Sequence, residues 1–101
     1  MIKLEELKRN GSKFSLQSLY INPSWIITVR EDFSLTNDLR CEQMKSKFPQ
    51  DLDDRHVLSR LTYAEGASCS TVIVVGSPEV VFSKISKEKN TISGPLNILK
   101  G

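Results

Sequence analysis

The stretch TVIVVGSPE, residues 71–79, decides how this chain of 101 residues folds. Its first five residues form a continuous β-branched run, which is typical of a central strand that is buried on both faces. The last three residues predict the start of a helix. Ser77 can cap it, Pro78 fits the first helical position, and Glu79 complements the positive end of the helix dipole. The stretch therefore predicts a central strand followed by a short helix whose apolar side covers the sheet.

Strand patterns also occur upstream of this stretch. Four segments alternate apolar and polar residues or are rich in β-branched and aromatic residues: 2–7, 14–21, 25–29 and 57–63. Asn10 and Gly11 suit a tight hairpin turn between the first two segments, and Pro23 separates the second from the third. The small residues 64–68 indicate a flexible loop before the central strand. The pattern thus favours hairpins and a largely antiparallel sheet.

Between the third and fourth strands, apolar residues recur at helical spacing. We expect one helix of two to three turns within residues 34–47, ended by Pro49. The whole pattern predicts an α+β fold: a small, mostly antiparallel, curved five-stranded sheet with two short helices. Residues 1–88 should form a single globular domain. Residues 89–101 should form a C-terminal tail that is either flexible or a docking strand.

The residue types that catalysis and metal binding need are sparse. Cys41, His56 and Cys69 lie far apart, without the close pairs of ligands that a structural zinc site uses. A Cys-His catalytic pair is formally allowed, but nothing in the spacing selects it. The acidic run 51–54 lacks the glycine and the final glutamate of a calcium loop, and no phosphate-binding glycine loop occurs. We therefore expect a non-enzymatic protein with no metal and no cofactor.

Composition also bears on the compartment. Two isolated cysteines fit a reducing environment, and the acidic N-terminus does not match a signal peptide. No apolar run approaches the roughly 20 residues of a membrane helix. A formal net charge of +2 argues neither for nor against a polyanionic partner. We expect a cytoplasmic protein without a membrane partner.

Several of these segments resemble those of known families. Residues 1–4, Asn10-Gly11, 14–16, Asn22-Pro23 and 25–29 resemble the opening of the FlbD family of small flagellar and swarming-motility proteins. The helix start at Glu79 is similar to the end of that family. Small uncharacterised proteins of tailed bacteriophages share this opening and a Val-Val-Gly end like residues 74–76, and residues 31–70 are an insertion relative to both groups. The resemblance rests on structural positions and carries no catalytic residue, and the likeness to phage proteins implies a phage-encoded origin.

A third likeness is one of layout alone. The spacing from Asn22 to Ile27 is similar to that of the RemA-type regulators, which bind DNA as oligomeric rings. The arginine-rich loop of those regulators is absent, since only Arg55 and Arg60 flank the corresponding region.

Two kinds of function fit the sequence. The first is an accessory or adaptor protein that binds another protein, with Tyr20 and Trp25 as candidate contacts because aromatic residues dominate interface hot spots. The alternative for both aromatic residues is a place in the core. The partner could also be a second copy, because the apolar strand 71–75 needs cover and helices are few.

The second kind is a nucleic-acid-binding regulatory protein. Its candidate contacts are basic residues near the first turn and near the C-terminus: Lys8, Arg9, Lys13, Lys84, Lys87 and Lys89. The two groups could bind phosphates together if they lie on one face, and binding would then weaken steeply with salt. The alternative is that these basic residues form a solvated surface that binds no ligand.

Overall fold

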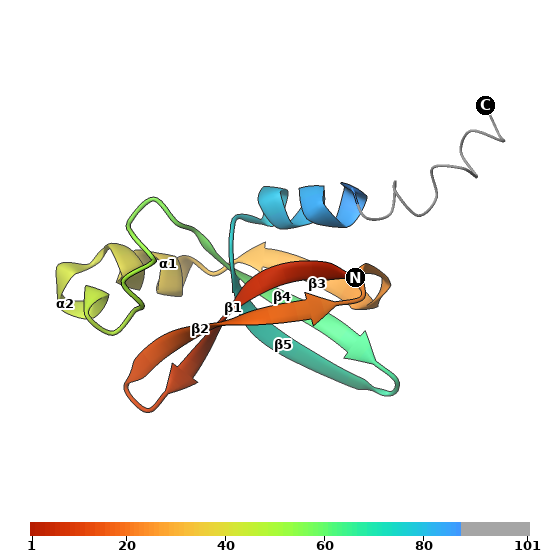
Figure 1. Ribbon diagram of the computed structural model, residues 1–101, viewed down its shortest axis with the longest axis horizontal. Helices are drawn as coiled ribbons and strands as arrows, with labels where there is room; N and C mark the ends of the chain where they lie inside the picture. The colour runs from red at the N-terminus through yellow and green to blue at the C-terminus, as the bar shows by residue number, and fades with distance from the viewer. Residues whose placement is uncertain (88–101) are drawn as a thin grey trace, which may run out of the picture.

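One five-stranded antiparallel sheet organises the computed structural model, which describes residues 1–87 (Figure 1). The strand order is β2-β1-β5-β4-β3, so the predicted antiparallel α+β fold is confirmed. The elements are β1 (Ile2–Asn10), β2 (Lys13–Ile21), the 3-10 turn η1 (Pro23–Trp25), β3 (Ile26–Glu31), α1 (Phe33–Arg40), α2 (Glu42–Lys45), β4 (Leu58–Glu65), β5 (Ser68–Val75) and a helix at residues 78–87.

The sheet is strongly curled. Residues 22–25 connect β2 at one edge of the sheet to β3 at the other edge. A flat sheet of five strands is about 19 Å wide. A connection that contains a 3-10 turn rises only about 2 Å per residue there, so it is too short to cross that width. The sheet must therefore curl until the end of β2 approaches the start of β3.

The central position of β5 is confirmed, and its residues 72–75 pack against an apolar core on each face, but the expected full burial is wrong. Of residues 71–75 only Val74 is fully buried, and Thr71 is exposed. The apolar cores cover residues 72–75 and do not extend to Thr71, and β1 pairs with β5 only at Glu6–Val74 and Leu7–Ile73. The expected flexible loop 64–68 is also wrong: it is a two-residue turn at 66–67, in which Gly66 has a φ of 64°.

The inside of the curl and the helix at 78–87 enclose the first of two apolar cores. We call this the helix-side core. Its buried members are Ile2, Leu4, Ile21, Leu61, Val74, Val81 and Ile85. The helix begins as the sequence predicts, because the Ser77 hydroxyl accepts a hydrogen bond from the Val80 amide at 3.2 Å. Val81 and Ile85, four residues apart, then face the sheet.

The second core lies on the other face, under the segment that links β3 to β4. We call this the α1-side core, and its buried members are Leu7, Leu39, Phe48, Leu52 and Leu58. The rings of Phe14 and Phe48 stack beside it, with centroids 4.8 Å apart. On this side the backbone carbonyl of Lys47 also accepts a hydrogen bond from the Phe14 amide at 2.7 Å, which ties the segment between β3 and β4 to β2.

The helix expected within 34–47 is present as α1, but a second short helix, α2, follows it with Cys41 between them, so the protein has three short helices and not two. Cys41 has extended backbone, with φ −87° and ψ 122°. Its amide still bonds to the Asp38 carbonyl at 3.1 Å, which closes α1. The resulting bend lets the chain beyond α2 return Phe48 to the core.

Within residues 1–87, no helix combines the length and the apolar character that crossing a membrane requires.

Candidate functional site

An apolar groove runs between the helix at 78–87 and β3, the strand beneath it in Figure 1. We call it the β3 groove. Its volume is about 510 Å³. The residues that line it come from η1, β3 and the helix: Pro23, Ile26, Ile27, Thr28, Val29, Pro78, Glu79, Phe82 and Ile85. Two segments that are far apart in the sequence therefore form its walls.

The helix wall follows from helical spacing. Pro78, Phe82 and Ile85 recur at intervals of four and three residues, which places them on one stripe of the helix. Ile85 is 9% exposed and belongs to the helix-side core. Phe82, in contrast, is 66% exposed. The outer part of this stripe thus presents a large aromatic side chain to solvent.

The strand wall follows from a β-bulge. Ile26 pairs with Tyr63 and Thr28 pairs with Thr62, so Ile27 is an extra residue without a partner in β4. Bulges commonly redirect a side chain near a binding site and interrupt an edge strand. Here the Ile27 side chain lines the groove and is 55% exposed. Because β3 is an edge strand, no strand of the sheet pairs with its outer side.

The chemistry of the groove is mainly apolar. Thr28 and Glu79 are the residues with polar side chains in its lining. Sites for small polar ligands usually combine an apolar lining with several convergent polar groups that fix orientation. Two polar side chains would fix the orientation of a small ligand poorly, so the groove is better suited to the apolar side chains of a polypeptide.

Trp25 lies next to this groove in the chain, but not where the sequence placed it. It ends η1 instead of opening the strand, because Asn22 caps the turn through a hydrogen bond from the Ser24 amide at 3.0 Å. Trp25 is 38% exposed and Tyr20 is 64% exposed, so neither fills the core. Tyr20 lies opposite Lys3 in the β1–β2 pair. Neither aromatic residue is among those that line the groove.

Ile27 and Phe82 were not identified as contact residues from the sequence. The available signal for Phe82 was an aromatic residue outside the core-facing pair Val81 and Ile85 of a well-predicted helix. No comparable signal existed for Ile27, since the bulge depends on how β3 pairs with β4.

The structure does not bring the two groups of basic residues together. Lys8, Arg9 and Lys13 surround the turn at the end of β1, where the Arg9 guanidinium lies 5.3 Å from the centre of the Phe14 ring. Lys84 lies on the helix at 78–87, and its Nζ is 3.5 Å from the carbonyl oxygen of Lys3, at the opposite end of β1. Lys87 is exposed on the helix, and Lys89 lies outside the described residues.

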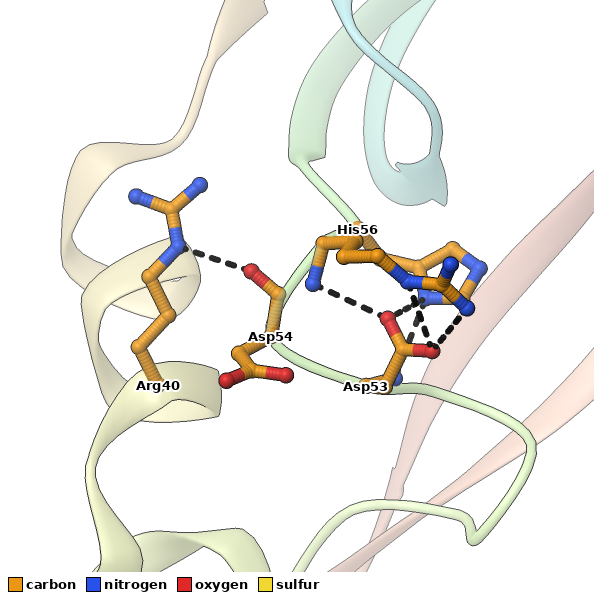
Figure 2. A network of polar contacts seen from close by, with 5 residues as sticks. Arg40, Asp53, Asp54 and His56 are labelled. Carbon is orange, nitrogen blue, oxygen red and sulfur yellow. Dashed lines mark hydrogen bonds and ion pairs between the residues drawn. The ribbon is translucent and has the colours of Figure 1, made fainter.

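A polar cluster holds the loop before β4 (Figure 2). The Arg40 side chain reaches from α1 and donates a hydrogen bond from Nε to the Asp54 carbonyl at 3.2 Å. The Asp53 amide donates to His56 Nδ1 at 3.0 Å. Hydrogen bonds from the Arg55 side chain and amide hold the pKa of Asp53 at about 2, below its ordinary value of 3.8. The cluster fixes the loop, and the carboxylate of Asp53 is already bonded to Arg55.

Both cysteines of the chain are free thiols. Cys41 is a half-buried free thiol, and Cys69 is an exposed one on β5. In the part of the chain that the structure describes, no three His, Cys, Asp or Glu side chains gather to hold a metal ion.

Comparison with known proteins adds no relative. The chain matches no family model, no curated protein and no solved structure. The resemblance to FlbD-like and phage proteins therefore stays a prediction.

Proposed function

We propose that this protein is a non-enzymatic cytoplasmic adaptor that binds an apolar segment of another protein in the β3 groove. The observation that carries the proposal is the exposure of Phe82 and Ile27 on opposite walls of one groove. Large apolar side chains that contact little of their own protein gain most from burial against a partner. An aromatic anchor at the centre of a patch is also the usual hot spot of an interface.

Two other readings receive less support. The groove volume falls within the range of small-molecule sites, but its two polar side chains would orient a ligand poorly. Nucleic-acid binding through the basic residues near the turn and the C-terminus needs both groups on one face. Arg9 instead lies at one end of β1, whereas Lys84 of the helix contacts Lys3 at the other end. Protein contact through the β3 groove is the function that the geometry supports best.

Site-specific photo-crosslinking tests this proposal. A photoreactive phenylalanine analogue at position 82 should form a discrete adduct in cells that produce the protein. The same analogue at position 33 is a matched control, because Phe33 is 68% exposed and is not among the groove residues. Equal adducts at both positions, or none at position 82, would contradict the proposal.

Substitution gives a quantitative test once the adduct is identified. Phe82→Asp and Ile27→Asp should each weaken binding of that partner at least about tenfold, since each places a charge in an apolar contact. Phe33→Asp should change it less than about twofold.

A second copy of the chain is one partner that the groove could accept. Light scattering at micromolar concentration, compared between the parent protein and Phe82→Asp, tests this. A dimer that Phe82→Asp converts to a monomer would identify the partner as self. A monomer in both samples would exclude a second copy as the partner at that concentration.

A further inference from the structure

The face of β3, β4 and β5 away from the helix-side core carries a second feature, beside the part of that face that the α1-side core covers. Leu61 is fully buried in that core, and side chains alternate along a strand. Its neighbours in β4, Arg60 and Thr62, therefore point to the opposite face. The register places Arg30 opposite Arg60 and Thr71 opposite Thr62 on this same face. We call these four residues the arginine-threonine face.

Two arginines opposite each other need an explanation, because like charges in directly facing cross-strand positions destabilise a sheet. Arg60 has a partner: its Nη2 lies 3.0 Å from Asp32 Oδ2. The other oxygen of Asp32 already accepts a hydrogen bond from the Leu35 amide at 3.0 Å. Among residues 1–87, none of the ion pairs involves Arg30, although its side chain is exposed. The face thus presents a guanidinium without a bonded carboxylate.

The threonines add hydrogen-bond donors beside it. The Oγ1 atoms of Thr62 and Thr71 lie 3.2 Å apart, and one hydroxyl donates to the other. A single hydrogen bond uses one of the two hydroxyl protons, so the second proton remains able to donate to a ligand. Guanidinium and hydroxyl donors together are the groups that bind phosphate oxygens.

The rest of this face is compatible with an anion. On this face Leu58, Ile73 and Val75 are covered by the α1-side core, and the carboxylate beside it is that of Asp32, which is already bonded to Arg60. The other side chains of β4 and β5 on this face include no carboxylate: Arg60, Thr62 and Ala64 in β4, and Cys69 and Thr71 in β5. They include no aromatic ring either, so the face offers no platform for stacking bases. A ligand would be held through its charged backbone and not through its bases.

We propose that the arginine-threonine face binds the phosphodiester backbone of a nucleic acid, without sequence preference. Arg30 pairs with phosphate oxygens, Arg60 adds the N–H donors that Asp32 leaves unused, and the hydroxyls of Thr62 and Thr71 donate to the same backbone. This site is separate from the β3 groove, and it differs from the basic groups near the turn and the C-terminus. An adaptor with both sites would bring a protein partner to a nucleic acid.

Fluorescence anisotropy with the full chain tests the site. The probes are a labelled single strand of about 20 thymidines and a duplex of about the same length, titrated between about 50 and 200 mM salt. Arg30→Ala should weaken binding of at least one probe roughly tenfold and reduce the salt slope by about one. Arg30 is exposed on an edge strand, so the variant should keep its fold, which circular dichroism on heating will verify.

Arg55→Ala is the matched control, since Arg55 has an 88% exposed side chain in the loop before β4 and its loss changes the net charge equally. It should change binding less than about twofold. An equal effect of both variants would overturn the assignment to this face, and so would the absence of binding to either probe at the lowest salt. Displacement of the probe by inorganic phosphate at matched ionic strength would overturn the nucleic-acid ligand in favour of a small phosphate compound.

Discussion

The two apolar cores are built from similar residues, yet one is closed and the other leaves a groove. In the α1-side core, the segment between β3 and β4 returns to the sheet and is fixed at several points. Asp32 caps α1, Thr36 bonds to β4, and Arg40 holds the following loop. In the helix-side core, a single helix covers the curled sheet and turns Phe82 outward. The closed core is thus the one whose covering segment is held by polar side chains at several points.

The largest expected effect tests whether the two cores form one cooperative unit. Leu61 and Leu39 are both fully buried, one in each core. Leu61→Ala and Leu39→Ala should each lower the free energy of unfolding by about 2–5 kcal/mol, because each leaves a cavity. Urea unfolding measures the loss. Hydrogen exchange of Leu39→Ala should show faster opening of α1 than of β5, and equal acceleration in both would mean that the cores are not separable.

The next effect tests the polar anchor of the closed core. The Thr36 hydroxyl donates to the Leu58 carbonyl at 3.3 Å and accepts from the Leu58 amide at 3.0 Å. Thr36→Val should lower the free energy of unfolding by about 1–3 kcal/mol, because the buried amide loses its partner. Thr71→Val is the control at an exposed site and should stay within about 0.5 kcal/mol of the parent protein. Equal unfolding curves for the two variants would show that the anchor is not needed.

A smaller effect is expected at the groove. Phe82→Ala removes a side chain that is mostly in solvent, so the free energy of unfolding should change by less than about 0.5 kcal/mol. Val81→Ala, one residue earlier and fully buried, should cost at least about 1.5 kcal/mol, because it removes two buried methyl groups and leaves a cavity. A loss for Phe82→Ala as large as that for Val81→Ala would mean that Phe82 packs as core and is not available for a partner.

The smallest effect concerns the loop of the closed core and depends on pH. The pKa of Asp53 is about 2 in the folded protein, below its ordinary value of 3.8, mainly because of the Arg55 side-chain hydrogen bond. A lowered pKa stabilises the fold above about pH 4, and this contribution is lost as the pH falls through 2. Asp53→Asn should therefore lower the Tm slightly at neutral pH. Thermal melts should show the difference shrinking between pH 4 and pH 2, and a difference that persists at pH 2 would contradict this cause.

Features set by neighbouring residues were predictable. The strands, the turn at Asn10-Gly11 and the start of the last helix depend on β-branched side chains, on glycine's tolerance of positive φ, and on a local cap. For the same reason the sequence indicated that β5 lies in the centre of an antiparallel sheet. The exposed aromatic residues Tyr20 and Trp25 could be listed as contacts, but whether they were buried could not be decided.

The remaining features depend on contacts between distant residues, so only the tertiary structure decided them. Cys41 interrupts a helical pattern because the chain must bend to bring Phe48 back to the core. Ile27 bulges because of the register between β3 and β4, and the curl follows from a short connection between the two edges of the sheet. The β3 groove and the arginine-threonine face both arise from this pairing. A pattern of local propensities contains no register, and register decides which side chains meet.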